Sequence, residues 1–228
     1  EPILPETEVS HVGQVLALVV AHSHRAARQA AQLAQIDIAP GTPLLHARQA
    51  HAAGAHVLPS VRLARGDAAA ALAEAPMRLQ GQLEVGGQEH FYLEGQIASV
   101  QAQEGGQWLV HSSTQHPGEV QHWVAHALGL HAHRVRVECR RMGGGFGGKE
   151  TQAGHLAVWA AVAAHATGRP VKLRLDRDDD FLITGKRHPF AYDYTVGFDS
   201  EGRLLGLDLT MLANCGFSAD LSGPVADR

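Results

Sequence analysis

The chain has 228 residues, of which 45% are hydrophobic, and its 19 basic and 23 acidic residues give a net charge of −4. This length suffices for one large domain or two small ones, and without a long block of like charges the chain is a poor candidate for binding nucleic acid or anionic membranes. Its apolar runs fall far short of the roughly 20 residues that span a bilayer, and its two cysteines, Cys139 and Cys215, are too few for a disulfide framework and favour a cytoplasmic location.

The first 42 residues are predicted to form a small α/β unit. Residues 12–21 are a continuous apolar run with β-branched side chains, which indicates a buried strand. Ser23 stands at the N-cap position of an alanine-rich helix over 24–34, and a second strand is expected over 36–39. Pro40-Gly41 then ends the unit, and residues 43–62 have the small, polar composition of a linker.

Residues 63–228 are predicted to form a larger part in which strands and helices alternate without a strict βαβ rhythm. Alternating hydrophobicity marks most of the strands, and capping residues or glycines mark the helix ends. The expected elements are a helix to residue 75, strands over 77–85, 91–102 and 108–113, a helix over 117–129, a strand over 134–140, a helix over 150–167, a strand over 171–175 and a hairpin around residues 200–202. This order favours an α+β fold with mixed sheets.

A glycine-rich loop over residues 143–148 is the most specific feature of the sequence. It carries five glycines in six positions between a predicted strand and a predicted helix. Glycines remove side-chain bulk and permit positive φ, so backbone N–H groups in such a loop can approach a ligand closely. The loop is therefore expected to bind a ligand through its backbone.

Two well-known glycine motifs fit this loop only in part. The dinucleotide pattern G-x-G-x-x-G occurs at 143–148, but the preceding strand over 134–140 is rich in arginine, and Asp176 comes too late to bind a ribose. The phosphate-binding pattern G-x-x-x-x-G-K ends at Lys149, but Glu150 stands where a Mg²⁺-binding Ser or Thr is required. Both interpretations are rejected.

Residues 143–150, GGGFGGKE, resemble the glycine-rich signature of the molybdenum hydroxylases of xanthine dehydrogenase type. Further segments resemble the same family in order and spacing, and the resemblance covers about residue 9 to the end. These segments are HFYLEGQ at 90–96, STQ at 113–115, RRM at 140–142, DR at 176–177 and ITGKRHP at 183–189. The resemblance implies that residues 1–42 are the remainder of an N-terminal hammerhead-like α/β domain and that 63–228 are the first part of a molybdopterin-binding domain.

The resemblance also implies site residues. Gln115, Gly145, Phe146 and Gly147 match cofactor-binding positions, and the Gln115 amide and the Phe146 N–H match groups that lie beside the molybdenum without being bonded to it. Both must then open onto one cavity, with their polar atoms within about 10 Å of each other. Glu150 matches the acid that binds the purine substrate, although a carboxylate favoured at a helix start is a second explanation.

The implied activity is hydroxylation of hypoxanthine or xanthine at a molybdenum–pterin centre. Electrons would pass to Fe–S clusters and FAD in a partner domain or subunit and then to NAD, so a hetero-oligomer is expected. No catalytic residue is assigned to this chain, and the chain is expected to be an internal piece of a longer enzyme that is inactive alone. The competing hypothesis is a non-catalytic α/β binding or scaffolding module.

The 16 histidines do not indicate a metal site by their spacing. His122 and His126 share one face of a predicted helix at the spacing of a metalloprotease motif, but Trp123 stands where that motif requires Glu. His131 and His133 follow closely, and we expect all four to be solvated or capping residues.

Overall fold

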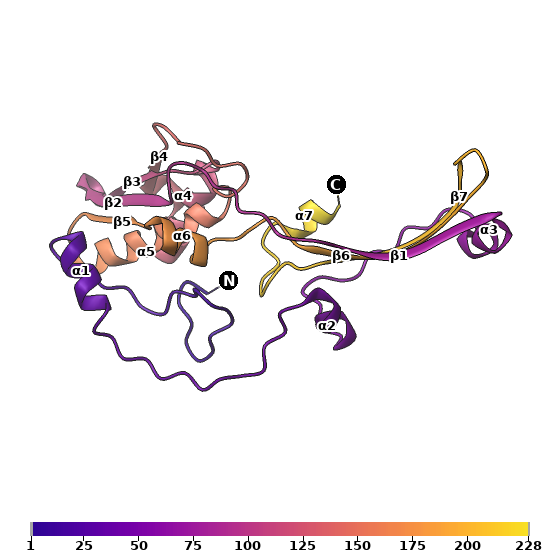
Figure 1. Cartoon of the computed structure of the whole chain (residues 1–228). Helices are drawn as coiled ribbons and strands as arrows, with labels where there is room; N and C mark the ends of the chain where they lie inside the picture. Colours follow the sequence, from indigo (N-terminus) through magenta and orange to yellow (C-terminus); the bar gives the residue numbers. More distant parts are fainter. Residues whose placement is uncertain (1, 228) are drawn as a thin grey trace. The chain divides into compact units, whose positions relative to one another are not determined.

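The structure is a computed structural model that describes residues 2–227 (Figure 1). The chain divides into two compact units, each built from two segments. Unit 1 combines the described part of Glu1–Pro40 with Glu89–Lys186, and unit 2 combines Gly41–Gln88 with the described part of Arg187–Arg228. The division expected at residues 42 and 62 concerns domains of a longer protein and stays a prediction.

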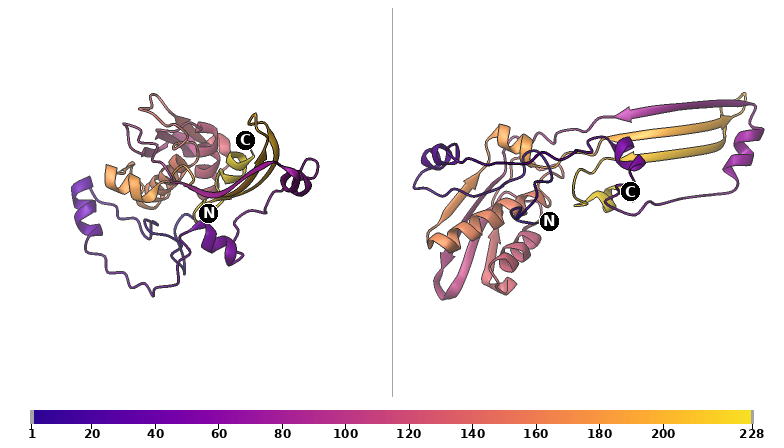
Figure 2. Two further views of the ribbon diagram at one scale, coloured as in Figure 1. Left: turned by 45° about the vertical axis from the view of Figure 1, so that its right-hand side comes forward. Right: turned by 90° about the horizontal axis from the view of Figure 1, so that it is seen from below.

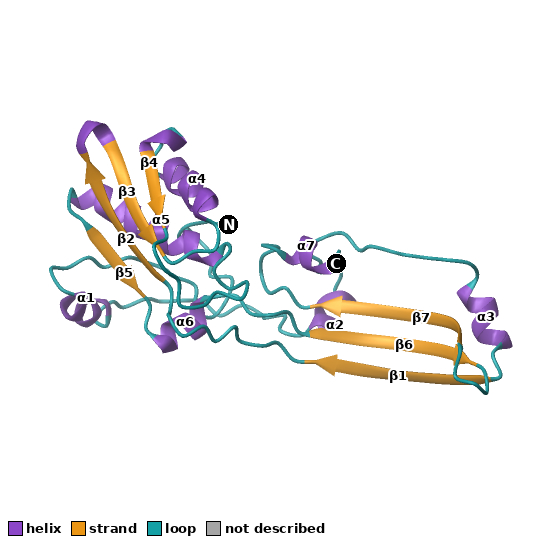
Figure 3. Cartoon of the chain, turned by 90° about the horizontal axis from the view of Figure 1, so that it is seen from above, coloured by secondary structure: helices purple, strands orange, loops and turns teal. Residues whose placement is uncertain are grey.

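Unit 1 contains a four-stranded sheet with the order β4-β3-β2-β5 (Figure 3). The strands are β2 Ile97–Gln103, β3 Gln107–Ser112, β4 Val135–Glu138 and β5 Val171–Arg174. A short turn, η1 Glu104–Gly106, joins β2 to β3 as the expected hairpin. Because β4 runs parallel to β3 and the other pairs are antiparallel, the sheet is mixed, which confirms the predicted fold class.

Two helices, α4 Pro117–Ala127 and α5 Gln152–Thr167, pack against this sheet and close its core. α5 is buried along most of its length, and its core neighbours include Val100, Val110 and Val124. It ends at Gly168, whose left-handed conformation terminates the helix as expected. Unit 1 also contains η2 Ala132–Arg134, α6 Arg177–Ile183 and α1 His24–Ala31, whose N-cap is Ser23.

The two strands predicted near the N-terminus are absent, because residues 12–21 and 36–39 have no strand conformation. Val15 and Leu18 pack against the core of unit 1, but other apolar side chains of these segments are exposed, with Val20 46% and Ile36 54% exposed. A strand requires a hydrogen-bonded neighbour, and within residues 2–227 neither segment pairs with one. Apolar composition was therefore not sufficient to predict these elements.

Unit 2 contains a three-stranded antiparallel sheet with the order β1-β6-β7 (Figure 2). β1 Met77–Val85 has the predicted bounds, and β6 Phe190–Phe198 and β7 Leu204–Ala213 form the predicted hairpin. The hairpin turn is held by Asp199, whose side chain accepts hydrogen bonds from two backbone N–H groups of the turn. The helices of unit 2 are α2 Ala47–Ala52, α3 Ala68–Glu74 and α7 Ser222–Ala226.

Three predicted boundaries differ around the glycine loop. The strand expected over 91–102 begins only at Ile97, so the segment 91–96 is irregular, and the strand expected over 134–140 is limited to Val135–Glu138. The helix expected from residue 150 begins at Gln152, with Thr151 as its N-cap. In the part of the chain that the structure describes, the helices are all too short or too polar for a transmembrane segment.

Candidate functional site

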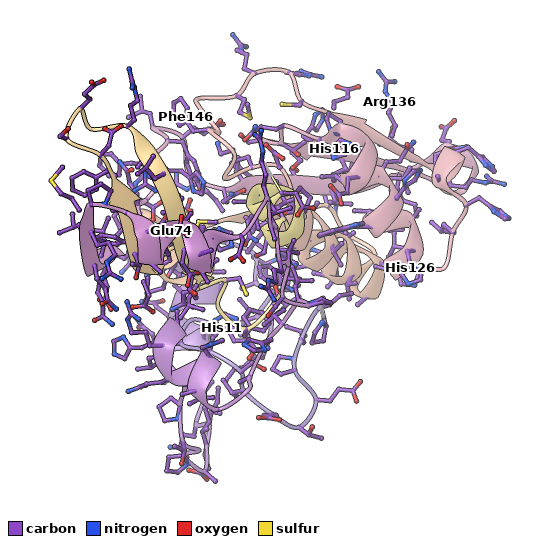
Figure 4. The ribbon with its side chains drawn as sticks, turned by 90° about the vertical axis from the view of Figure 1, so that its right-hand side faces the viewer. His11, Glu74, His116, His126, Arg136 and Phe146 are labelled. Carbon is purple, nitrogen blue, oxygen red and sulfur yellow. The ribbon has the colours of Figure 1, made fainter. Side chains whose placement is uncertain are left out.

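The glycine loop connects β4 to α5 with an unusual backbone conformation. Gly147 has φ of 96°, and Phe146 has φ of 55°, a left-handed value that non-glycine residues rarely adopt. A hydrogen bond of 2.8 Å from the Gly148 N–H to the Gly145 carbonyl closes the turn around Phe146. The Phe146 side chain is 73% exposed (Figure 4), so its ring contributes little burial, and its backbone is the more constrained part.

Gln115, which follows β3, lies directly against this loop. Its Oε1 atom accepts hydrogen bonds from the N–H groups of Gly147 at 3.0 Å and Lys149 at 3.2 Å. The Gln115 backbone N–H donates in turn to the Lys149 carbonyl at 2.9 Å. A Cβ atom on Gly145 would overlap Gln115 Oε1, so this close approach requires glycine at position 145. Because its oxygen is occupied, Gln115 can offer a ligand only its amide N–H₂ group.

The predicted proximity of Gln115 and the Phe146 backbone is therefore confirmed. The Gly147 N–H donates to Gln115 Oε1 at 3.0 Å, and Gly147 directly follows Phe146. Since consecutive residues are about 3.8 Å apart, Gln115 Oε1 and the Phe146 nitrogen lie within roughly 7 Å of each other. This lies well within the expected separation. The cofactor contacts assigned to Gln115, Gly145, Phe146 and Gly147 stay a prediction.

The side chain of Lys149 is fully buried beneath the loop, with a relative exposure of 0%. Its Nζ atom donates to the Glu94 carbonyl at 2.6 Å and to Ser113 Oγ at 2.9 Å, and it lies 3.4 Å from Glu94 Oε2. Nζ also lies 4.6 Å from the centre of the Tyr92 ring. Burial lowers the pKa of Lys149, and the Glu94 carboxylate opposes that shift.

The Glu94 carboxylate connects the start of the loop with the end of β3. Its Oε2 atom accepts hydrogen bonds from the Gly143 N–H and from Ser113 Oγ, both at 2.8 Å. Burial acts to raise the pKa of Glu94, but these two hydrogen bonds and the charge of Lys149 outweigh it and hold the pKa below its ordinary value. Glu94 is therefore charged at neutral pH.

A second carboxylate, that of Asp180 on α6, holds the irregular segment before β2. It is 1% exposed and accepts hydrogen bonds from the Tyr92 hydroxyl at 2.6 Å and the Gln96 N–H at 2.8 Å. Gln96 Nε2 donates onward to the Gly148 carbonyl at 2.8 Å. Burial, together with Asp180, raises the pKa of Tyr92. A continuous polar network therefore links α6 to the glycine loop.

Arg177, the first residue of α6, adds a second connection to the same segment. Its guanidinium donates to the carbonyls of Tyr92 at 2.9 Å and Leu93 at 2.7 Å. These bonds satisfy carbonyls that an irregular segment would otherwise leave without partners. The family-like segments at 90–96, 143–150 and 176–177 thus meet around one polar network.

Glu150 lies at the C-terminal end of the loop and is partly buried. α5 has no acidic residue in its first turn, because the helix begins only at Gln152. Glu150 therefore stands directly before the N-cap Thr151, outside the first turn of α5, and the explanation by the helix dipole is untested. Its role in substrate binding is untested by this geometry and stays a prediction.

Comparison with known proteins identifies the domain that carries this site. Residues 50–228 match the family model of the molybdopterin cofactor-binding domain. The chain belongs to this family. It is also similar over its whole length to xanthine dehydrogenases, with 40% identity to xanthine dehydrogenase/oxidase of Gallus gallus over 229 residues and 41% identity to xanthine dehydrogenase 1 of Arabidopsis thaliana over 238 residues. It spans 17% of the length of each of these relatives.

Solved structures of related proteins share the fold of this molybdopterin cofactor-binding chain. Quinoline 2-oxidoreductase from Pseudomonas putida 86 superposes with a TM-score of 0.79 and 26% identity, covering 92% of this chain and 28% of that protein chain. Aldehyde oxidoreductase from Desulfovibrio gigas gives a TM-score of 0.79 and 28% identity, covering 93% of this chain and 24% of that one.

The exposed donors of the site suit the molybdopterin cofactor of the family. Gln115 is exposed and offers a neutral amide donor, and the exposed residue Phe146 lies beside it in a loop where glycine removes side-chain bulk. Neutral N–H donors suit an anionic metal–pterin group, because they bind its oxygen and sulfur atoms without introducing another charge. Among residues 2–227, no group of three or more His, Cys, Asp or Glu side chains could hold a metal ion.

Sequence reasoning missed four residues of this site, namely Glu94, Lys149, Arg177 and Asp180. Lys149 was considered as a phosphate-binding lysine and as part of the 143–150 signature. Glu94 and Arg177 lie in segments noted only for their resemblance, and Asp180 lies between two such segments. No local pattern reveals a buried charge whose partners lie more than 30 residues away, because the partners meet only in the folded chain.

Proposed function

We propose that this chain is the part of a molybdenum hydroxylase that holds one side of the cofactor and orients a purine substrate such as hypoxanthine or xanthine. The observation that carries the proposal is the contact of Gln115 with the N–H groups of Gly147 and Lys149, which places an amide donor beside the glycine loop. The identity of about 40% to xanthine dehydrogenases supports the purine as substrate class.

The roles of the chain's own residues follow from their donors and acceptors. The Gln115 amide and the Phe146 N–H would hold the cofactor by hydrogen bonds, and Gly145 and Gly147 allow the close approach. Glu150 would accept a hydrogen bond from a purine N–H and so fix the orientation of the ring. When bound, the molybdenum–pterin group supplies the oxidation chemistry.

Electron transfer requires further components. Electrons released by purine hydroxylation would leave through Fe–S clusters and FAD in a partner domain or subunit and reduce NAD, so the proposal includes a hetero-oligomeric assembly. It also includes a cytoplasmic location, which rests on the small number of cysteines; Cys139 and Cys215 are both free thiols. Nothing in the comparisons favours a non-catalytic binding module.

The test uses the natural protein that contains this chain, purified from cells that make the cofactor. Molybdenum is measured by mass spectrometry, pterin by the fluorescence of its oxidised form, and xanthine turnover by the absorbance of urate. The proposal predicts stoichiometric molybdenum and pterin, with xanthine preferred over quinoline and benzaldehyde. A protein without pterin, or one that prefers an aldehyde, would contradict the proposal.

A further inference from the structure

One backbone N–H group and two side chains, from different segments, converge on one carboxylate oxygen below the glycine loop. Glu94 Oε2 lies 2.8 Å from the Gly143 N–H donor, 2.8 Å from Ser113 Oγ and 3.4 Å from Lys149 Nζ. We call Glu94, Ser113 and Lys149 the loop clasp. The clasp touches the first residue of the loop, the last part of the loop, and the segment that continues to Gln115.

We propose that Glu94 and Lys149 are positioning residues that hold both ends of the glycine loop and the Gln115 segment in one arrangement. Neither residue would touch the cofactor. The inference rests on the proposed function, because this arrangement affects binding only if the loop and Gln115 contact the same ligand.

A loop with five glycines needs such a constraint more than an ordinary loop does. Glycine has more accessible backbone conformations than any other residue, so fixing several of them costs the most conformational entropy. The clasp supplies directional bonds at the two ends, Gly143 and Lys149, whereas Gln115 contacts the middle. The close approach of the loop to Glu94 also depends on glycine, because a Cβ atom on Gly143 would lie 2.6 Å from the Glu94 Cβ.

An ion pair in this place is explained better by geometry than by stability. The Lys149 side chain is fully buried but the Glu94 side chain is 40% exposed, so solvent weakens the attraction between the two charges, and the cost of removing the lysine charge from water offsets it further. What an apolar residue cannot provide is a set of hydrogen bonds of fixed direction. Lys149 Nζ donates to the carbonyl of Glu94 and the hydroxyl of Ser113 as well as to the Glu94 carboxylate, so it fixes two chain segments at once.

The experiment compares Lys149→Met with the unchanged natural protein, each prepared with and without cofactor. Hydrogen exchange is measured at the amides of Gly143, Gly147 and residue 149, together with the unfolding midpoint and the rate at which molybdenum is lost on dialysis. Losing hydrogen bonds to a charged group should reduce amide protection at Gly143 and Gly147 by about ten- to a hundredfold. Amide protection elsewhere in unit 1 should change little, and molybdenum should be lost faster.

Glu138→Gln is the matched control. Glu138 on β4 pairs with Arg136 at 2.6 Å and Arg140 at 3.3 Å, and these arginines are 77% and 74% exposed. The control variant removes a carboxylate charge from the same unit without touching the clasp, so it should leave loop protection and molybdenum retention unchanged. If Lys149→Met does not fold, Glu94→Gln carries the test: the Gly143 N–H keeps a neutral acceptor in place of a charged one, so its protection should fall by less, and molybdenum should still be lost faster.

The outcomes separate this inference from the proposed function. Unchanged protection and retention in the clasp variants, or a loss of protection spread evenly over unit 1 together with a lower unfolding midpoint, would overturn the positioning role. A natural protein that holds no molybdenum would overturn the proposed function, and the exchange data on the cofactor-free protein would still decide whether the clasp orders the loop.

Discussion

The Gln115 side-chain oxygen accepts hydrogen bonds from two backbone N–H groups, those of Gly147 and Lys149. The oxygen therefore holds the glycine loop, and the amide nitrogen can donate to a ligand. Phe146, in contrast, holds a left-handed backbone while its ring is largely exposed. In both residues, the atoms that we propose to contact the cofactor are N–H donors, and contacts within the chain fix their positions.

Gln115→Glu separates the two tasks of this side chain. A carboxylate oxygen still accepts the N–H groups of Gly147 and Lys149, so protection of these amides should be retained or increased. The donor is lost and a negative charge is added beside an anionic group, so kcat/KM for xanthine should fall by at least about tenfold. Steady-state kinetics and hydrogen exchange measure the two effects, and an active variant would show that the amide nitrogen is not used.

Glu150→Ala tests the proposed substrate contact. Because the proposed partner of the carboxylate is the substrate and not the cofactor, molybdenum content should stay at the level of the unchanged protein. A lost hydrogen bond to a charged partner is worth about 1.5–3 kcal/mol, so kcat/KM for xanthine should fall roughly ten- to a hundredfold. Aldehydes, which lack the second ring of a purine, should be affected much less. Equal losses for both substrate types, with loss of molybdenum, would indicate that Glu150 supports the loop instead.

The lowered pKa of Glu94 predicts how the loop responds to acid. A carboxylate whose pKa is lower in the folded state than its ordinary value of 4.5 stabilises the fold above that value, and the contribution is lost as pH falls through the lowered pKa. Amide protection at Gly143, corrected for the intrinsic pH dependence of exchange, should therefore fall below pH 4.5. Glu94→Gln should remove this dependence, while Lys149, the charge that faces Glu94, stays protonated in this range. If Glu94→Gln kept the same pH dependence of Gly143 protection, that dependence would come from a group other than Glu94.

At the scale of elements, the sequence predicted those whose signals are local. β1 has the predicted bounds, α5 ends at Gly168, and the hairpin at η1 lies where glycines were found. The N-terminal strands failed, because strand formation depends on a partner that composition does not reveal. α6 was missed, although Asp176 is a helix N-cap whose side chain accepts from the Asp179 N–H at 3.0 Å; such a cap signal would have been visible.

The site was also predictable only in part, because most of its contacts join residues that are far apart in the sequence. The meeting of Gln115 with the loop was inferred from resemblance, whereas the residues that enforce it act over long separations in the sequence. Glu94 and Lys149 are 55 residues apart, and Asp180 reaches a segment 84 residues before it. Local periodicity cannot report such contacts.

Asp180→Asn tests the contribution of α6. One carboxylate oxygen accepts from the Tyr92 hydroxyl and the other from the Gln96 N–H, so an amide nitrogen would face a donor at one of these positions. Leaving a buried donor without an acceptor costs about 1–3 kcal/mol, and the unfolding free energy measured with urea should fall by this amount. Asp178→Asn, at an exposed position of the same helix, is the control and should have no measurable effect. Equal stability of both variants would contradict the role of the network.

At the scale of the whole molecule, the chain combines a mixed α+β fold with membership in the molybdopterin cofactor-binding domain family. It spans 17% of the length of the xanthine dehydrogenases of Gallus gallus and Arabidopsis thaliana. The proposed hydroxylation therefore depends on residues and redox groups beyond those described. The expectation that the 228-residue chain alone oxidises no purine stays a prediction.

The most direct test is an experimental structure of the natural protein, purified with its cofactor and with xanthine bound. We expect a molybdenum–pterin group within hydrogen-bond distance, roughly 3 Å, of the Gln115 amide nitrogen and the Phe146 N–H, with the Glu150 carboxylate facing the purine. A cofactor bound elsewhere in the protein, with Gln115 and the glycine loop facing solvent, would contradict it.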